Sequence, residues 1–424
     1  MSELILTLRQ AAQVGDRARS DFVLGTQDHL PGMVVRGAFA AAWIATHGVT
    51  VPDTPSRTQF LRLFEGSEGG VRFGPLFCGA RPVPLSVLSH TYEPGENCAV
   101  VEYDRALALR DEVPERCPDC GSPLEQVKAL GGDRPAIRRR TSVAIAPSDV
   151  ARRGQIVTRD TLEAGQEFRG TVIASDPGLL ADLAALGQVR VGGRRTTHGT
   201  ADVRIAEGDP PPTAQRREDG LLVLRLRSPG VFVDARGRPS RDPDAAELAA
   251  VLGGPARVLR RWTRWHSVGG WHVASGLPKP VELAVAPGST YLIDAEREVS
   301  DAALYALGRR GVGLRRHEGF GDLAPPPRLR PGRKDRDSQA RRQRGLLDDI
   351  APLRGLAVRR PELWRPLLAR LTAHAAGDRT ATEFLTRMAR DLLGRDPRTG
   401  EALTRFLGFA PQDAAYVARE LSAP

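Results

Sequence analysis

The sequence contains few lysines, few cysteines and no long hydrophobic run. Only three of its 61 basic residues, Lys128, Lys279 and Lys334, are lysines, so 58 are arginines. Four cysteines in 424 residues do not provide a disulfide framework. The longest apolar stretch near the N-terminus, residues 38–45, is too short to cross a bilayer. Because residues 1–3 also lack the basic start of a secretory signal, we expect a cytoplasmic protein without membrane contacts.

Familiar catalytic signatures are missing as well. The sequence has no HD pair, no GGDD motif and no P-loop. Interpretations of the chain as an HD nuclease, a nucleotide cyclase or an ATPase therefore have no support. Metal-dependent cleavage of a target would need an acidic residue on a flexible loop, and Asp28 is the one candidate for that role.

What the chain has in excess is positive charge. The net charge is +10 and the isoelectric point is near 10.1, which favours a polyanionic partner. A GC-rich coding bias also produces arginine, so the positions of the arginines carry more information than their number. They occur in pairs or triplets, mostly beside glycine or an aromatic residue, at residues 138–140, 152–153, 194–195, 260–261, 309–310, 315–316 and 341–342.

One glycine-rich loop occurs twice, 120 residues apart. Residues 191–203 read VGGRRTTHGTADV and residues 311–323 read GVGLRRHEGFGDL. In register, the matched pairs are Gly193 with Gly313, Arg195 with Arg315, Gly199 with Gly319, and Asp202 with Asp322. Upstream, residues 164–168 are similar to residues 287–291. We interpret the repeat as two related modules, each presenting a basic glycine loop to a polyanion; the alternative is two tight turns with solvated arginines.

Hydrophobic periodicity predicts an α+β fold with tandem ferredoxin-like (RRM-like) domains. A strand, a helix, another strand and a glycine loop follow one another twice along the chain, which is half of a ferredoxin-like unit. We place the first domain at 1–206, with an insertion at about 77–140, and the second at 220–324. A charged linker is expected at 325–345 and a helical C-terminal domain at 346–424, where Trp364, Leu367, Leu368 and Leu371 have helical spacing.

Residues 29–40, HLPGMVVRGAFA, resemble the IPGSSLRGAL segment of RAMP proteins. RAMP proteins are the RNA-binding, ferredoxin-like subunits of CRISPR effector complexes. The loops at 192–199 and 311–321 resemble the glycine-rich loops that end RAMP domains. The resemblance covers roughly residues 1–324 and leaves the helical tail unmatched.

Within the superfamily, the sequence is most similar to the two-domain type III-D subunit at the crRNA 5′ tag. The likeness rests on residues 60–64, 71–75, 287–291 and 315–321 and on the later Cys-x-x-Cys. It implies a non-catalytic subunit for antiviral defence that holds the crRNA tag. The implied protein partners are a large polymerase-like subunit and the backbone RAMP subunits, with target RNA contacted indirectly.

The start of the segment at residues 29–40 suggests how RNA would be bound. Pro31 and Gly32 would begin a helix whose free N–H groups attract phosphate. Arg36, on that turn, could close over a phosphate or pair with Asp28. Trp262, Trp265 and Trp271 are candidate base-stacking residues, although a tryptophan is more often a core residue. The candidate RNA-binding residues are Gly32, Arg36, Gly37, Gly193, Arg194, Arg195, Gly199, Gly313, Arg315, Arg316, Gly319 and Gly321.

The cysteines suggest a metal site. Cys117-Pro118-Asp119-Cys120-Gly121 has the form of a knuckle that supplies half of a tetrahedral zinc site. Cys98 is the nearest third ligand, and Cys78 or His90 are further possibilities. Such a site would be structural. The alternative is a pair of surface thiols in a turn.

Two other functions are alternatives to that of an RNA-binding subunit. RAMP-type processing endoribonucleases cut repeat RNA without metal, using a histidine that helps to remove the 2′-OH proton. His29, His198 and His317 are the candidate bases in this chain. A third possibility is a protein scaffold whose basic surface contacts acidic partners.

Overall fold

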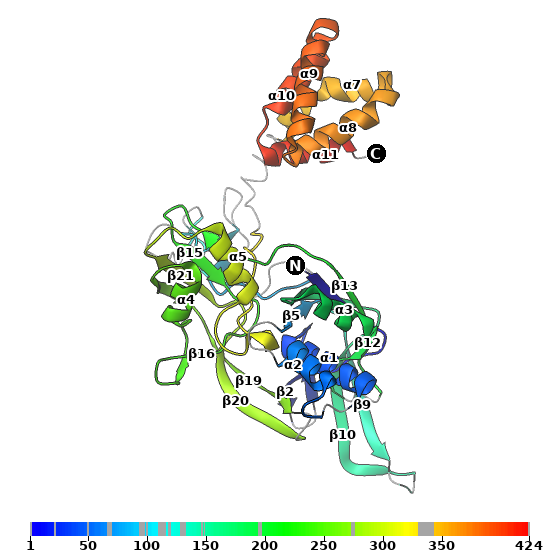
Figure 1. Ribbon diagram of the computed structural model, residues 1–424, viewed down its shortest axis with the longest axis vertical. Helices are drawn as coiled ribbons and strands as arrows, with labels where there is room; N and C mark the ends of the chain where they lie inside the picture. The colour runs from blue at the N-terminus through cyan, green and yellow to red at the C-terminus, as the bar shows by residue number, and fades with distance from the viewer. Residues whose placement is uncertain are drawn as a thin grey trace. The chain divides into compact units, whose positions relative to one another are not determined.

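The computed structural model divides into two compact units (Figure 1). The first comprises Met1–Tyr92, Glu102–Cys117 and Ser122–Leu329, and the second contains Arg330–Pro424. The structure describes residues 2–422 except 21–22, 49–50, 66–69, 93–97, 99–100, 109–115, 118–119, 128–132, 146, 148, 194–196, 273–275 and 330–342. Among the residues described, no helix has both the length and the apolar character needed to cross a membrane.

Four strands of a six-stranded antiparallel sheet form the centre of the first domain. In chain order the elements are β1 (Ser2–Leu8), α1 (Gly32–His47), β5 (Arg72–Phe77), β11 (Glu167–Ile173), α3 (Pro177–Ala185) and β13 (Thr200–Glu207). The strands lie in the order β13-β1-β11-β5, which is the ferredoxin-like arrangement. Two short strands, β12 (Gln188–Arg190) and β4 (His29–Leu30), extend the sheet at its edges.

The core of this domain lies between the sheet and α1. Leu4 and Leu6 of β1 and Phe39 and Trp43 of α1 are fully or almost fully buried in one cluster. Helix α2 (Pro55–Phe64) begins at Thr54, whose hydroxyl accepts a hydrogen bond from the backbone N–H of Arg57. The packing of α1 on the sheet fixes where the N-terminus of α1 lies.

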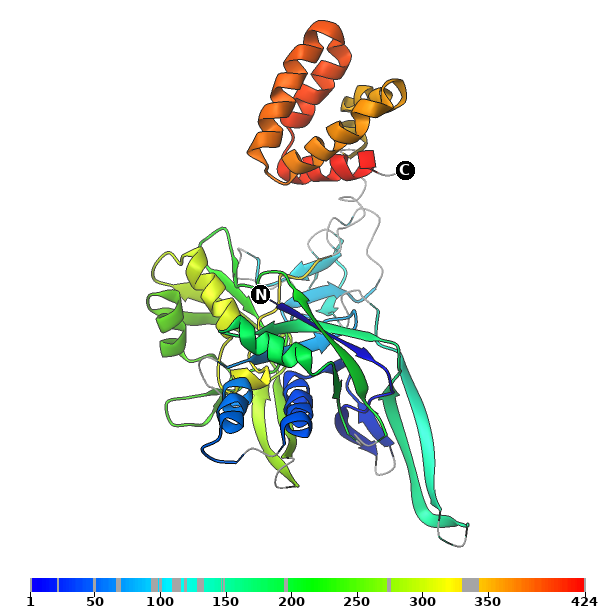
Figure 2. The ribbon, with the colours of Figure 1, turned by 45° about the vertical axis from the view of Figure 1, so that its right-hand side comes forward.

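A long insertion separates β5 from β11. It contains the sheet β7-β6-β8, made by β6 (Val87–His90), β7 (Glu102–Asp104) and β8 (Leu124–Gln126), and a hairpin of β9 (Ile137–Ile145) and β10 (Ala151–Leu162). Figure 2 shows this hairpin, in green-cyan, extending away from the domain. With β2 (Gly15–Ser20) and β3 (Val23–Thr26) it forms the sheet β2-β3-β10-β9.

The insertion therefore continues past residue 140, where the sequence analysis ended it. Residues 155–158 belong to β10, which pairs with β9 and β3 and not with the central sheet. Alternating hydrophobicity marks a strand with one covered face, but it does not specify which sheet the strand joins.

The second domain repeats the same order of elements. It contains β15 (Leu222–Arg225), α4 (Ala245–Leu252), β18 (Ala256–Trp262), β21 (Thr290–Ala295) and α5 (Asp301–Arg310), with β14 (Gln215–Arg216) at the sheet edge. The strand order β14-β15-β21-β18 places β15, β21 and β18 as strands one, three and two of a ferredoxin-like domain. A single antiparallel bridge between Leu226 and Leu323 stands where a fourth strand would pair with β15. The α+β class and the tandem ferredoxin-like fold are confirmed.

The second domain also contains two β-hairpins. One is β16 (Phe232–Val233) with β17 (Pro239–Ser240), and the other is β19 (Trp265–His272) with β20 (Leu277–Val285). The β19–β20 hairpin connects strands two and three of the domain, and its pairing was not predicted from the sequence. The sequence signal for this hairpin was a pair of segments with alternating hydrophobicity on either side of Gly276, a turn glycine with a φ of 67°.

From residue 343 onward, the described part of the chain consists of helices joined by short turns. Its helices include α7 (Ala351–Arg359), α8 (Pro361–Ala375), α9 (Arg379–Arg395), α10 (Pro397–Leu407) and α11 (Pro411–Ser422). Leu367 and Leu371 of α8 are buried in the core of this unit, and Trp364 and Leu368 pack against it. The predicted helical extension is confirmed, whereas most of the predicted charged linker lies outside the described residues.

Candidate nucleic-acid interface

A cleft of about 1350 Å³ lies between the two ferredoxin-like domains. The first turn of α1 forms one part of its wall, both glycine loops form another, and the β19–β20 hairpin forms a third. Val268 and Ala284 of the hairpin pack with Phe320 of the second loop and with Met33 of α1. Three elements that are distant in the sequence thus enclose one space.

The two glycine loops have equivalent places in the two domains, between the second helix and the fourth-strand position. Three backbone hydrogen bonds of the first loop recur around the second. In the first loop, Val191 N–H donates to Gly199 O, Gly199 N–H to Ala11 O, and Gly193 N–H to Gln13 O. The equivalent bonds of the second loop, in the same order, are Val312 N–H to Gly321 O, Gly321 N–H to Pro229 O, and Leu314 N–H to Val231 O. The loops are thus related in structure as well as in sequence.

The hydrogen bonds correct the register of the repeat. Gly199 corresponds to Gly321 and not to Gly319, and Gly193 corresponds to Leu314 and not to Gly313. The second loop has one residue more between its hydrogen-bonded ends, so no single offset aligns the whole loop. The upstream match of residues 164–168 with 287–291 is confirmed, because Gly165 and Gly288 donate equivalent backbone bonds to Leu8 and Leu226.

The start of α1 packs directly on the second glycine loop. A Cβ atom on Gly32 would lie 2.2 Å from the carbonyl oxygen of Phe73 and 2.8 Å from the Cα of Gly319. Gly319 has a φ of +85°, and a Cβ there would lie 2.3 Å from the same oxygen of Phe73. Both glycines are needed because backbone meets backbone at this contact.

Replacing Gly32 with alanine is expected to lower the free energy of unfolding by about 1–3 kcal/mol, because the added methyl group has no space. At Gly37, further along the same helix, a Cβ would have no atom within 4 Å among the described residues, apart from its chain neighbours and the nearby backbone of α1. Gly37→Ala is therefore the matched control and should raise stability by about 0.5–1 kcal/mol. Urea unfolding of both variants measures the difference; equal effects would show that the Gly32 contact is not tight.

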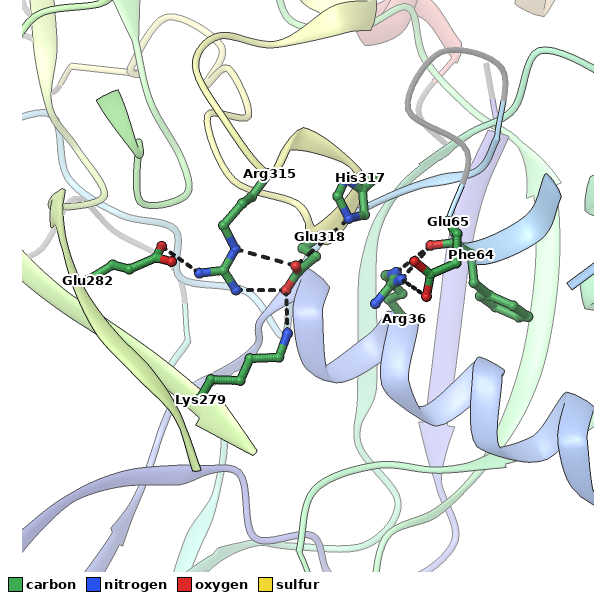
Figure 3. Close-up of polar contacts among 8 residues, drawn as sticks. All are labelled: Arg36, Phe64, Glu65, Lys279, Glu282, Arg315, His317 and Glu318. Atoms are coloured by element: carbon green, nitrogen blue, oxygen red, sulfur yellow. Dashed lines mark hydrogen bonds and ion pairs between the residues drawn. The ribbon is translucent and has the colours of Figure 1, made fainter. Parts of the chain in front are cut away.

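Arg315 lies in an ion-pair cluster at the entrance to the second loop (Figure 3). Its guanidinium donates to Glu318 at 2.8 and 3.3 Å and to Glu282 at 2.8 Å, and it lies 4.6 Å from the ring centre of Phe320. Lys279 from β20 reaches the same Glu318 carboxylate at 3.1 Å. Burial acts to raise the pKa of Glu318, but hydrogen bonds and charge from Arg315 and Lys279 outweigh it and hold the pKa at about 2.

Arg36 and Arg316, the other two candidate RNA-binding arginines among the described residues, also have partners within the chain. Arg36 donates to the backbone carbonyl of Phe64 at 2.8 Å and lies 3.3 Å from Glu65, rather than pairing with Asp28 (Figure 3). Arg316 pairs with Glu247 of α4. These contacts hold the loop and α1 in position. Arg194 and Arg195 lie outside the described residues.

A comparison with known families agrees with this geometry. Residues 167–324, from β11 through the second glycine loop, match the family described as CRISPR-associated protein (Cas_Cmr3). Over these residues the chain is similar to a RAMP-type family of type III CRISPR systems. The RAMP resemblance of the sequence is thereby confirmed at the level of the superfamily.

Several solved structures are partly similar to this chain. A chain of type III-B Cmr-beta bound to cognate target RNA and AMPPnP is 12% identical, with 69% of this chain and 86% of the other covered at a TM-score of 0.41. A chain of the type III-A Csm3–Csm4 subcomplex is also 12% identical, with 71% and 95% covered at 0.35. Thermus thermophilus Cas6 is 14% identical, with 77% and 98% covered at 0.31. No curated protein matches the sequence.

The three histidines that are candidate bases lie in different surroundings. His29 lines the cleft, stacks on Phe77 at 5.3 Å and lies 3.0 Å from Asp28. The hydrogen bond from His29 is the main cause of the lowered pKa of Asp28. His198 contacts Thr197 and lines a separate, smaller pocket, and burial lowers the pKa of His317. Of the three, only His29 lines the cleft.

The three candidate tryptophans differ in exposure and in their contacts. Trp271 on β19 is 60% exposed and lines the cleft. Trp265 lies against the guanidinium of Arg241 at 5.0 Å, and half-buried Trp262 packs in a small cluster with Val223 and Leu292. Trp271 is thus the one of the three whose surface faces the cleft. Exposed Arg134 also lines the cleft, and no motif of the sequence marked it as a site residue.

Proposed function

We propose that this chain is a non-catalytic RNA-binding subunit of a type III CRISPR effector complex and that RNA lies in the cleft between its two domains. One observation carries the proposal: the start of α1 and both glycine loops line the same space. A polyanion in that space would meet backbone N–H groups from three elements at once.

Helix α1 would supply one of these contacts. It is 16 residues long, and the structure gives Pro31 at its N-cap no side-chain capping hydrogen bond. The N–H groups of Val34 and Val35 donate to the carbonyl oxygen of Pro31, so the helix dipole and the N–H groups before Val34 are what would attract a phosphate. Because Arg36, Arg315 and Arg316 are paired within the chain, we assign them to holding the cleft in shape. Exposed Arg134 and Trp271 are the side chains that would contact RNA directly.

The finer assignment rests on the sequence resemblance. We propose that the bound RNA is the 5′ tag of crRNA, that the complex is of the III-D kind, and that the chain contacts a large polymerase-like subunit and backbone RAMP subunits. Target RNA would then be contacted only indirectly. Co-expression with those subunits, followed by sequencing of the co-purified RNA, tests the tag assignment.

The arrangement of the histidines favours RNA binding over RNA cleavage. A metal-free endoribonuclease needs a base within reach of the 2′-OH proton. His29 is the candidate base that lines the cleft, and His198 and His317 are not placed to assist it there. The runner-up function is repeat-RNA cleavage by His29.

The deciding experiment incubates purified full-length protein with 5′-labelled CRISPR repeat RNA in EDTA, on native and denaturing gels and over a salt series. We expect a native shift with intact RNA and an affinity that falls steeply as salt rises. Cleavage that His29→Ala abolishes would establish the endoribonuclease instead. Absent or salt-insensitive binding would favour a protein scaffold.

Trp271→Ala is expected to weaken RNA binding about tenfold, because stacking of one base on an aromatic ring contributes about 1–3 kcal/mol. Tyr305→Ala is the control, since Tyr305 on α5 is 41% exposed and does not line the cleft. Fluorescence anisotropy with labelled RNA measures both variants, and Trp271→Phe should recover most of the affinity. An equal loss in the two alanine variants would remove Trp271 from the binding surface.

A further inference from the structure

A second cluster of reactive side chains lies in the insertion between β5 and β11. It consists of His90, Cys98, Cys117 and Cys120, and none of them lines the cleft. Cys98 and Cys117 are 1% and 2% exposed, and none of the chain's four cysteines is in a disulfide bond. Two buried thiols next to a third thiol and an imidazole need a chemical explanation.

Local backbone pairing brings the histidine to the cysteine knuckle. In the register of β6 with β8, His90 pairs with Leu124, and the N–H of Thr91 donates to the carbonyl oxygen of Pro123 at 3.0 Å. The knuckle is closed by a hydrogen bond from Cys117 N–H to Ser122 O at 2.8 Å, with Gly121 at a φ of 69°. The end of β6 and the knuckle are therefore held side by side.

The four donor atoms lie within 4.8 Å of one another. Zinc binds sulfur at about 2.3 Å and imidazole nitrogen at about 2.0–2.1 Å, so tetrahedral ligand atoms are roughly 3.5–4 Å apart. Three thiolates and one imidazole are a set that favours Zn²⁺ over Mg²⁺ or Ca²⁺. We propose that His90, Cys98, Cys117 and Cys120 bind one structural zinc ion. The histidine, and not Cys78, completes the set that the sequence left open.

The proposed zinc site would stabilise a contact between the insertion and the second domain. The sheet β7-β6-β8 carries Asp104, which binds Arg225 of β15 at 2.6 Å with both side chains 1% exposed. Ala106 packs against Val223 and Leu292 of the same domain. By fixing the end of β6 and the knuckle, zinc would hold this small sheet in the position that these contacts need. The site does not depend on RNA binding.

The test begins with the zinc content of the full chain, purified without chelator. We expect one zinc ion per chain, and loss of that zinc in Cys117→Ser, Cys120→Ser and His90→Ala. Cys78→Ser is the matched control and should keep its zinc, because Cys78 lies outside the cluster and contacts Gln166. A wild-type protein without stoichiometric zinc, or a Cys78 variant that loses it, would overturn the proposal.

Cobalt substitution keeps the test decisive if the variants fail to fold. Wild-type protein reconstituted with Co²⁺ should show thiolate-to-cobalt charge-transfer bands and the visible bands of a tetrahedral ion. Chelator should lower the melting temperature of the zinc-bound protein. No thiolate bands together with a mass lower by two hydrogens would reveal a disulfide in place of the metal and would contradict the proposed site.

Discussion

Replacing Asp322 with asparagine is expected to destabilise the protein by about 3–5 kcal/mol, because the change leaves two buried arginines without their counter-charge. The side chain of Asp322 is 3% exposed, and its two oxygens accept hydrogen bonds from Arg72 and Arg227, each at 2.5 Å. Arg72 belongs to β5 of the first domain, whereas Arg227 and Asp322 belong to the second. The carboxylate, near the end of the second glycine loop, therefore joins the two ferredoxin-like domains directly.

Urea unfolding of the full chain, followed by tryptophan fluorescence, measures this effect. Asp294→Asn is the control, since Asp294 pairs with Arg257, whose side chain is 73% exposed, and should cost less than about 1 kcal/mol. Similar losses in the two variants would mean that the buried triad contributes no more than a surface ion pair.

Glu318→Gln is expected to cost about 3 kcal/mol at pH 7. The folded state lowers the pKa of Glu318 from 4.5 to about 2, and one pKa unit corresponds to about 1.4 kcal/mol. Because the folded pKa is depressed, this stabilisation is complete above about pH 4.5. It is lost as the pH falls toward 2, where the wild-type carboxyl becomes protonated. The difference between wild type and variant should therefore shrink over that interval.

The pH series distinguishes this prediction from a simple packing defect. A loss caused by altered shape would persist unchanged from pH 7 to the acid limit of folding. Glu282→Gln is the matched control: Glu282 binds the same arginine, but its side chain is 42% exposed and its loss should cost less than about 1 kcal/mol. A pH-independent difference for Glu318→Gln would contradict the electrostatic explanation.

Many of the predicted site residues lie in the expected elements, but several have a different physical role from the one predicted. Gly32 lies at the start of α1, as the Pro31-Gly32 pair indicated, yet it must be glycine because the second loop packs against it. Arg315 is in the glycine loop, but its guanidinium is bound to Glu318 and Glu282 and does not project freely into the cleft. Residue type and position were predictable; the partners were not.

The repeat illustrates the same limit. A constant offset paired Asp202 with Asp322, whereas the backbone contacts make Thr200 the counterpart of Asp322. Asp202 binds Arg9 at the surface, and Asp322 joins two domains. Sequence similarity detected the duplicated loop, but the extra residue in the second copy changed which side chain faces the interior.

The sequence by itself determined the order of strands and helices, the two glycine loops and the helical tail. These follow from hydrophobic periodicity and glycine conformation, which are local properties of a short segment. Only the tertiary structure decided which charges are paired, which tryptophan faces the cleft, and that His90 rather than Cys78 joins the cysteine cluster. Those outcomes depend on contacts such as Arg72 with Asp322, between residues 250 positions apart, which no local pattern encodes.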